Sequence, residues 1–329
     1  MAHFLFCACQ PGSERMLKRE VARARPDWRP AFARPGLVTF KAETADTDLE
    51  NTELVFARRV GRSIGTANSA PAAAEAGRGA GARRLHVWDR AGEPVPPDLR
   101  EAIRRAGDLP IFEAEERPRT GETVLDIIVH ENEPWFIGTH VHRKGLSPFP
   151  GGALPVPGDV PEDAPSRAYR KLEEALLWSG ARPRAGETAL EIGSAPGGAS
   201  HALLRRGLEV VGIDPGEMAE VVAAHPRFRH LRQPIGAVRR EQLPPVVHWL
   251  LLDVNLAPQV ALHALRRIVP PIRRTLRGAI LTLKMNEEPF VDEIPGFMTR
   301  LGEMGARELR ATQLPANRRE ICVYGRFGL

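Results

Sequence analysis

The stretch from Glu187 to Asp214 constrains the fold of this chain more than any other. It predicts a buried strand, a glycine-rich turn, an amphipathic helix and a second strand that ends on an acid, at Ala189–Ile192, Gly193–Gly198, Ser200–Arg206 and Glu209–Ile213. This order of elements is half of a nucleotide-binding α/β unit. The chain is therefore expected to contain a mostly parallel sheet that binds a nucleoside cofactor.

The turn itself narrows the choice of cofactor. Its glycines do not follow the dinucleotide pattern G-x-G-x-x-G but the pattern Gly-x-x-Pro-Gly-Gly. A loop with so few side chains suits a bulky cationic nucleoside such as S-adenosylmethionine, and Asp214 is placed to accept hydrogen bonds from ribose hydroxyls. Asp214 alone would equally suit the ribose of NAD, so a nicotinamide-dependent oxidoreductase stays open as a weaker interpretation.

The composition limits the compartments and partners that suit the chain. It has 329 residues, 43% of them hydrophobic, and a formal net charge of +5 with a pI near 9.5, which permits a polyanionic partner such as RNA. No apolar run approaches the roughly 18 to 20 residues of a membrane span. The cysteines Cys7, Cys9 and Cys322 form no C-x-x-C pair. We expect a reduced, cytoplasmic protein with no membrane segment and no metal.

The predicted elements divide the chain into four parts. Residues 1–64 form an N-terminal α+β module with predicted strands at His3–Cys9 and Gly36–Lys41 and predicted helices at Ser13–Arg25 and Asp48–Val60. Residues 65–150 form a second α+β module, which begins with a mobile loop of low complexity at 65–82. Residues 151–165 are a linker rich in proline and glycine. Residues 166–329 alternate strands and helices, as in an α/β domain.

Four charged residues of the last part fall where α/β enzymes place their chemistry. Lys171 lies on the first helix of that part, Asp253 and Lys284 end apolar strands, and Glu320 begins the final strand. Ligands of open α/β sheets bind beyond the carboxyl ends of the strands. The last strand should run antiparallel, because its connection from Arg307–Gln313 is too short for a helical crossover. We therefore predict that the four side chains meet at one edge, beside the glycine-rich turn.

Two amines and two acids suit the removal of a proton from a ribose 2′-hydroxyl. An ordinary lysine, with a pKa of about 10.4, is protonated at neutral pH. A second ammonium group and partial burial are both expected to lower the pKa of a lysine here, while the carboxylates hold the amine in line. Arginine accounts for 41 of the 46 basic residues, so lysine at 171 and 284 points to a role that guanidinium cannot fill. The methyl group of a sulfonium would then pass to oxygen by in-line displacement.

Six short motifs, taken in order, make the chain similar to a known family. SRAYRKLEE (166–174), EIGSAPGG (191–198), GID (212–214), LLLD (250–253), LTLK (281–284) and RREICVYG (318–325) resemble the FtsJ-type ribose 2′-O-methyltransferases. The resemblance implies a Rossmann-like sheet, mostly parallel with its last strand antiparallel, S-adenosyl-L-methionine as the cofactor, and a tetrad of lysine, aspartate, lysine and glutamate. Within that family the chain is most similar to the bacterial enzymes that methylate a cytidine ribose of 23S rRNA. Their THUMP RNA-binding module would correspond to residues 65–150.

The resemblance also assigns roles to residues. It implies that Lys284 is the proton acceptor and that Lys171, Asp253 and Glu320 complete the catalytic group. The residues it places at the cofactor are Gly193, Ser194, Ala195, Pro196, Gly197, Gly198, Asp214, Gln233 and Asp253. Two departures concern the cofactor: Ala199 stands where the family has an aromatic residue, and Gln233 and Pro234 stand where an acid normally holds the adenine.

Other interpretations stay open at this stage. The expected substrate is 23S rRNA, but tRNA or another structured RNA fits the same residues. A non-catalytic RNA-binding assembly factor would share the scaffold. His140 and His142 alternate on one strand, and without a third ligand a surface or RNA-contact role is favoured over a metal site. Arg143 and Lys144, just before the linker, are placed to guide RNA.

Overall fold

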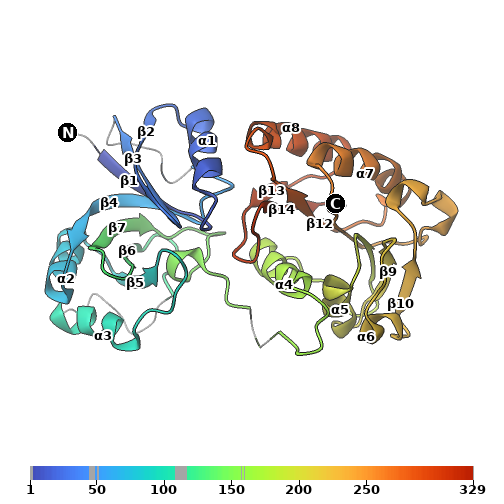
Figure 1. The fold of residues 1–329 in the computed structure, drawn as a ribbon, viewed down its shortest axis with the longest axis horizontal. Coiled ribbons are helices and arrows are strands. Elements are labelled where there is room, and N and C mark those ends of the chain that lie inside the picture. Colours follow the sequence, from blue (N-terminus) through green and yellow to red (C-terminus); the bar gives the residue numbers. More distant parts are fainter. Residues whose placement is uncertain are drawn as a thin grey trace. The chain divides into compact units, whose positions relative to one another are not determined.

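The computed structural model describes residues 3–43, 49, 52–107, 117–156, 158 and 160–328. The chain separates into two compact units, Met1–Leu154 (unit 1) and Pro155–Leu329 (unit 2). Each unit is built around its own seven-stranded sheet (Figure 1). Among the described residues, no helix has the length and apolar character needed to cross a membrane.

Unit 1 is an α+β unit whose sheet has the strand order β2-β3-β1-β4-β7-β6-β5. All neighbouring strands are antiparallel except β5 and β6, which are parallel. The strands are β1 His3–Ala8, β2 Trp28–Arg34, β3 Leu37–Ala42, β4 Arg59–Ala67, β5 Arg84–Asp89, β6 Thr123–Val129 and β7 Trp135–Val141. The helices are α1 Glu14–Ala24, α2 Ala70–Gly79 and α3 Pro97–Ala106, with a 3-10 turn η1 at Pro150–Gly152.

The predicted mobile loop at 65–82 is wrong, because these residues contain the end of β4 and the helix α2. Ser69 caps this helix, since its side chain accepts a hydrogen bond from the backbone N–H of Ala72. Ala73, Ala74 and Gly77 are buried on one face of the helix. Alanine is the best helix former, and such small side chains let a helix lie close to a sheet. A composition of alanine and glycine that suggested disorder thus forms a packed helix.

The predicted boundary between residues 64 and 65 also falls inside an element. Strand β4 crosses it and pairs with β1 along one edge and with β7 along the other. The two predicted N-terminal modules therefore share a single sheet. The linker predicted at 151–165 begins inside unit 1, since Gly151 and Gly152 belong to η1. Gly151 packs closely on unit 1, because a Cβ at this position would lie 3.0 Å from the ring of Trp88.

The helix predicted at Asp48–Val60 is absent from the part of this range that the structure describes. Residues 52–58 are not helical, and β4 begins at Arg59; residues 48, 50 and 51 lie outside the described residues. The buried carboxylate of Glu20 accepts hydrogen bonds from the backbone N–H groups of Val55 (2.7 Å) and Phe56 (3.0 Å). Glu20 thereby holds this segment against α1 in a conformation other than a helix.

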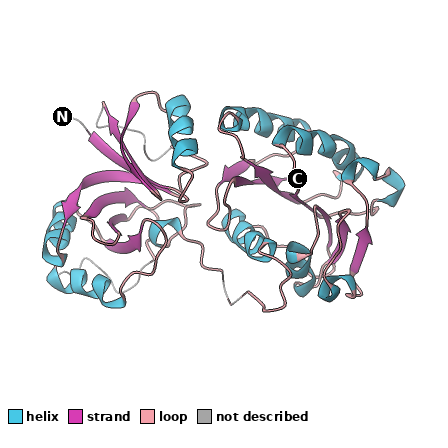
Figure 2. Cartoon of the chain, viewed as in Figure 1, coloured by secondary structure: helices cyan, strands magenta, loops and turns pink. Residues whose placement is uncertain are grey.

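Unit 2 is an α/β domain with helices on both faces of its sheet (Figure 2). The strand order is β10-β9-β8-β11-β12-β14-β13. The first five strands in that order are parallel, whereas β14 is antiparallel to both β12 and β13. The strands are β8 Thr188–Ile192, β9 Glu209–Ile213, β10 Phe228–Leu231, β11 Trp249–Asp253, β12 Gly278–Lys284, β13 Arg310–Thr312 and β14 Glu320–Arg326.

The helices of unit 2 form two layers. One layer contains α4 Ala168–Ser179, α5 Gly198–Arg205 and α6 Glu220–Ala223, and the other contains α7 Pro258–Ile272 and α8 Phe290–Glu303 (Figure 1). Two 3-10 turns, η2 Ile235–Ala237 and η3 Arg240–Gln242, follow β10. Because β8, β11 and β12 are parallel, their carboxyl ends lie at one edge of the sheet, where open α/β domains bind their ligands.

Candidate active site

The carboxyl edge of the unit 2 sheet brings the four predicted residues together. Lys171 lies in the first turn of α4, Asp253 is the last residue of β11, Lys284 is the last residue of β12, and Glu320 is the first residue of β14. Lys284 and Glu320 are direct partners in the register of β12 and β14. Strand pairing therefore positions three of the four side chains, and the docking of α4 positions the fourth.

The four side chains form a closed ring in which acids and amines alternate. The Lys171 Nζ donates to Asp253 Oδ2 at 3.1 Å and forms an ion pair with Glu320 Oε1. The Lys284 Nζ donates to Asp253 Oδ1 at 2.8 Å and to Glu320 Oε2 at 2.6 Å. Each carboxylate thus bridges both ammonium groups with its two oxygens. We call these four residues the tetrad.

The tetrad balances two positive and two negative charges, and between 9% and 23% of each side chain is exposed. Burial lowers the pKa of Lys284, but the charge of Asp253 and the hydrogen bonds to both carboxylates outweigh burial, so this pKa is raised above its ordinary value. Burial likewise opposes ionisation of Glu320, but hydrogen bonds from Lys171 and Lys284 hold its pKa below the ordinary value. For Lys284 in the protein without cofactor, the predicted lowering of the pKa is therefore wrong, because the two carboxylates outweigh the second ammonium group.

Two glycines of the predicted cofactor loop allow the tetrad to assemble. A side chain at Gly193, whose φ is +81°, would lie 2.2 Å from the carbonyl oxygen of Asp253. A side chain at Gly198 would lie 2.3 Å from the Oγ of Ser166 and 2.9 Å from the backbone nitrogen of Tyr169. Because these contacts leave no room for a Cβ, glycine lets the loop pack against β11 on one side and against α4 on the other.

A family comparison identifies this part of the chain. The model of the FtsJ-like methyltransferase family matches residues 164–267. Residues 164–267 of unit 2 thus match an FtsJ-like methyltransferase domain. The matched residues include Lys171, the glycine-rich loop and Asp253, whereas Lys284 and Glu320 lie beyond them and join the tetrad through the pairing of β12 and β14.

Several curated relatives share the name "Ribosomal RNA large subunit methyltransferase M". The one from Halorhodospira halophila is 35% identical over 188 residues, covering 55% of this chain and 53% of the relative. Those from Tolumonas auensis and Azoarcus are 30% and 31% identical, each over 69% of this chain and over 62% and 66% of the relative. The chain thus spans about half to two thirds of the length of these relatives. Among solved structures, TrmN from Thermus thermophilus has a TM-score of 0.36 at 15% identity and covers 99% of this chain and 100% of its own, a likeness that carries no weight for function.

The loop of the FtsJ-like domain fits a nucleoside cofactor such as S-adenosylmethionine. The carboxylate of Asp214 accepts hydrogen bonds from the backbone N–H groups of Ala195 (3.2 Å) and Gly216 (2.7 Å). An ionised carboxylate has about four lone-pair directions, so Asp214 keeps capacity for ribose hydroxyls. Ser194 is buried and its hydroxyl donates to the sulfur of Met218, while Pro196 is exposed and its carbonyl accepts from the N–H of Ala219.

The remaining predicted cofactor residues lie at the start of α5 and after β10. Gly197 is the N-cap residue of α5 and has a φ of +116°, a backbone conformation that favours glycine. Gln233 follows β10, and its side-chain amide donates to the Oε1 of Gln242 at 3.2 Å. Because this contact uses the nitrogen of Gln233, its carbonyl oxygen keeps capacity to accept a hydrogen bond, as an amino group of adenine would require.

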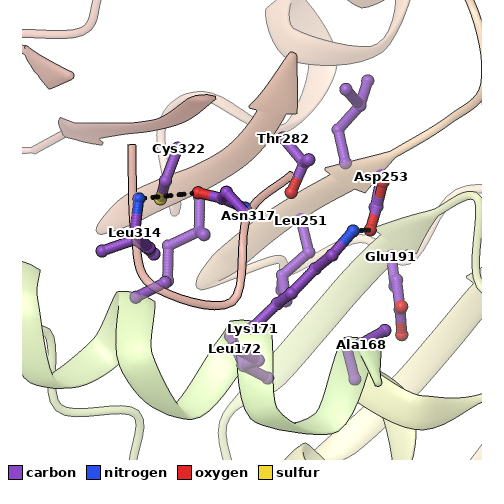
Figure 3. Close-up of a pocket in the computed structure, with 14 residues that line it drawn as sticks. Ala168, Lys171, Leu172, Glu191, Leu251, Asp253, Thr282, Leu314, Asn317 and Cys322 are labelled. Carbon is purple, nitrogen blue, oxygen red and sulfur yellow. Dashed lines mark hydrogen bonds and ion pairs between the residues drawn. The ribbon is translucent and has the colours of Figure 1, made fainter. Parts of the chain in front are cut away.

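A small cavity lies between α4 and the sheet, directly beside the tetrad (Figure 3). Figure 3 shows Lys171 reaching from α4 across the cavity to Asp253, with Glu191 beside them. Ala199, at the position where the family has an aromatic residue, also lines the cavity. An alanine there leaves open space that a ring would occupy.

Glu191 is an acidic residue of this region that sequence reasoning missed. It lies on β8, is only 2% exposed, and accepts a hydrogen bond from the hydroxyl of Ser200. Burial, reinforced by the charges of Asp253 and Asp214, raises the pKa of Glu191 to about 8. The signal in the sequence was an acid inside an otherwise apolar strand, which is unusual unless the acid is neutral or paired.

In unit 1, the structure corrects the surface role expected for two histidines. His140 and His142 are both only 6% exposed. The Nδ1 of His140 contacts the carboxylate of Asp126, which is fully buried. Among the residues that the structure describes, no group of three or more His, Cys, Asp or Glu is arranged to hold a metal ion. These histidines therefore belong to the interior of unit 1.

Proposed function

We propose that this chain is an S-adenosylmethionine-dependent RNA ribose 2′-O-methyltransferase that acts on large-subunit ribosomal RNA, with a cytidine of 23S rRNA as the target. The observation that carries the proposal is the ring of two lysines and two acids beside the glycine-rich loop. The names of the relatives supply the substrate class. The cytoplasm, where ribosomal RNA is made, is the corresponding compartment.

Lys284 is the proposed proton acceptor. Its Nζ donates two hydrogen bonds within the tetrad, one to each carboxylate, and an ammonium group has three donors. The carboxylates therefore fix the direction of the remaining position, which is where a ribose hydroxyl has to approach. Lys171 makes the equivalent contacts from the opposite side, which keeps Asp253 and Glu320 in place when Lys284 changes charge.

The raised pKa of Lys284 means that the protein alone holds this amine protonated. When bound, S-adenosylmethionine supplies an electrophilic methyl group and one positive charge. The tetrad itself carries no net charge, so the sulfonium adds one positive charge beside it. About 1.4 kcal/mol of repulsion lowers the pKa of an amine by about 1, so Lys284 gives up its proton more readily in the presence of the sulfonium.

Unit 1 is the proposed RNA-binding part, with residues 65–150 as the THUMP-like region. Helix α1 carries basic side chains, and Lys144 is exposed in the segment after β7. Arg143, expected to guide RNA, is half-buried and donates to the carbonyl oxygen of Leu49 at 3.0 Å. Lys144 is therefore a better candidate for a phosphate contact than Arg143.

The test of this proposal is the chemical position of the transferred methyl group. Ribosomal RNA is incubated with the protein and methyl-labelled S-adenosylmethionine and is then hydrolysed in alkali. A 2′-O-methyl group removes the nucleophile that cleaves the adjacent phosphodiester, so the label should remain in alkali-resistant dinucleotides. Label on a mononucleotide base contradicts the proposal. A parallel assay with tRNA separates the two RNA classes.

One observation favours a second candidate, a non-catalytic RNA-binding assembly factor. Ala199 replaces the aromatic residue that the family has next to the loop, and a cavity lies beside it. A decayed cofactor site would bind S-adenosylmethionine weakly or not at all. Calorimetry distinguishes the candidates, since the absence of binding at millimolar cofactor supports the assembly factor.

A further inference from the structure

The segment between β13 and β14 is held in one conformation by its own buried side chains. The side-chain amide of Gln313 donates to the carbonyl oxygen of Arg318 at 2.8 Å, and the side-chain oxygen of Asn317 accepts from the N–H of Leu314 at 3.0 Å. Gln313 and Asn317 are each 1% exposed. Burying an amide is costly unless it is hydrogen-bonded, so these two side chains define the shape of the loop.

Two further contacts fasten the same loop to the elements that carry the lysines of the tetrad. The carboxylate of Glu174, on α4 with Lys171, accepts from the N–H of Ala316 at 2.7 Å. The N–H of Met285, the residue after Lys284, donates to the carbonyl oxygen of Arg319 at 2.7 Å. The loop is therefore rigidly connected to the tetrad on both sides.

This loop presents two adjacent arginines, Arg318 and Arg319, directly before Glu320. Both are exposed, and neither guanidinium makes an ion pair or a hydrogen bond with a residue that the structure describes. By contrast, Arg326, at the other end of β14, forms an ion pair with Glu308. A surface arginine whose guanidinium has no acidic partner among the described residues, on a loop of fixed shape, is available for an external anion.

Because the tetrad has no net charge, RNA binding beside it requires a separate group of positive charges. Two lysines and two acids cancel, so the tetrad does not attract a polyanion. A ribose in RNA carries a phosphate on each side, and guanidinium groups bind phosphates with paired hydrogen bonds. We infer that Arg318 and Arg319 bind the RNA backbone phosphates next to the ribose whose 2′-hydroxyl faces the tetrad. This inference rests on the proposed function and assigns the groups that hold its substrate.

The test is the salt dependence of RNA binding by the full chain. Fluorescence anisotropy with a fluorescein-labelled oligouridylate measures phosphate contacts without base recognition. The double variant Arg318→Ala/Arg319→Ala should bind on the order of tenfold more weakly at low salt. Its plot of log Kd against log salt should be less steep by about 1.4, since each lost contact with a single strand removes about 0.7.

Unit 2 offers a matched control pair in Arg273 and Arg274. They are also adjacent and exposed, but they follow α7 near Gly278, the first residue of β12, at the edge of the sheet opposite Lys284. Arg273→Ala/Arg274→Ala removes the same charge and should leave the salt slope close to that of the wild type. The inference would be overturned if the wild type and the Arg318/Arg319 variant had equal salt slopes. It would also be overturned if the two double variants lost the same RNA affinity and the same part of the salt slope.

Two measurements separate this inference from the proposed function. Unchanged binding of S-adenosylmethionine shows that the Arg318/Arg319 variant is folded, and KM for ribosomal RNA should rise while kcat at saturating RNA stays near the wild-type value. Ribose methylation by the wild type together with an unchanged salt slope in the variant rejects the phosphate site alone. A reduced slope in the variant, with no ribose methylation by the wild type, rejects the proposed reaction and retains the phosphate site.

Discussion

Each unit contains a compact cluster of charged side chains, and the two clusters differ in their access to solvent. In unit 1, Asp126, His140 and Arg59 are 0%, 6% and 2% exposed. In unit 2, the side chains of the tetrad are 9% to 23% exposed at the carboxyl edge of the sheet. The unit 1 cluster is closed off, whereas a substrate can reach the tetrad.

The contacts of the two clusters differ in the same way. Arg59 donates to the carbonyl oxygens of Ser147 and Phe149, so its charge fixes the segment that leaves unit 1. The Nε and Nη1 of Arg59 and the Nε2 of His140 are buried without a hydrogen-bond partner in the part of the chain that the structure describes. In the tetrad, every carboxylate oxygen has an ammonium partner. We conclude that the unit 1 cluster stabilises a conformation and that the tetrad is built to react.

The largest effect is expected from Lys284→Ala, which removes the proposed base. General base catalysis contributes about 10²- to 10⁴-fold, so kcat for methyl transfer to ribosomal RNA should fall by about 10³ or more. Single-turnover transfer of labelled methyl measures this rate directly.

Lys284→Arg is the matched variant, because it keeps the positive charge but cannot lose a proton at ordinary pH. It should be nearly as inactive as Lys284→Ala while binding S-adenosylmethionine like the wild type. Transfer by the Arg variant within tenfold of the wild-type rate would mean that charge alone matters at this position.

The second effect tests the closed cluster of unit 1. Asp126→Ala removes the buried carboxylate that contacts His140 and whose charge favours the buried guanidinium of Arg59, and leaving a buried charge uncompensated costs about 3–5 kcal/mol. The free energy of unfolding of unit 1, measured by urea denaturation, should fall by that amount. Binding of S-adenosylmethionine by unit 2 should be unchanged; a loss of cofactor binding without a loss of stability would contradict the assignment of this cluster to structure.

The third effect concerns the packing that builds the tetrad. In Gly198→Ala, the new Cβ would lie 2.3 Å from the Oγ of Ser166, so α4 has to move. Overpacking of this kind costs about 1–3 kcal/mol of stability, and a displaced Lys171 should lower kcat about 10- to 100-fold. Gly236→Ala is a suitable control, because a Cβ there meets no atom within 4 Å.

The smallest effect is a pH dependence that originates from Glu191. Its pKa is raised from 4.5 to about 8 in the folded protein, so folding favours the protonated acid. The stability that this group contributes is complete below about pH 4.5 and is lost as the pH rises toward 8. Glu191→Gln mimics the neutral acid and should be more stable than the wild type at pH 8, by about 1 kcal/mol or more, and similar to it at pH 5. If the free energies of unfolding of the wild type and of Glu191→Gln differ by the same amount at pH 5 and at pH 8, the predicted loss of stability with rising pH is contradicted.

The parts of the site that the sequence predicts are those that depend on strand direction. Asp253, Lys284 and Glu320 stand at strand ends, and parallel strands bring such ends to one edge, so their meeting follows from the order of elements. The place of Lys171 in the site could also be predicted, because its helix leads directly into the same domain. The direction of the Lys284 pKa was predicted wrongly, because the number of carboxylate contacts depends on side-chain geometry rather than on position in the sequence.

The errors in the fold have similar physical causes. The low complexity of residues 65–82 predicts a mobile loop, although the alanines and glycines of helix α2 are buried and pack closely. The absence of a helix at residues 52–58 depends on Glu20, which lies more than thirty residues away and binds two backbone N–H groups there. Contacts between distant residues of this kind are not visible in local composition or periodicity.

The most direct measurement of the central claim, that a neutral tetrad becomes a base when a positive charge is added, is proton release on cofactor binding. Titration calorimetry near pH ~9, in two buffers of different ionisation enthalpy, gives the number of protons released; Glu191, with its pKa of about 8, is then already mostly ionised. S-adenosylmethionine should release more protons from the wild type than the uncharged thioether S-adenosylhomocysteine does, and Lys284→Met should abolish the difference. Equal release by the two compounds from the wild type would contradict the account.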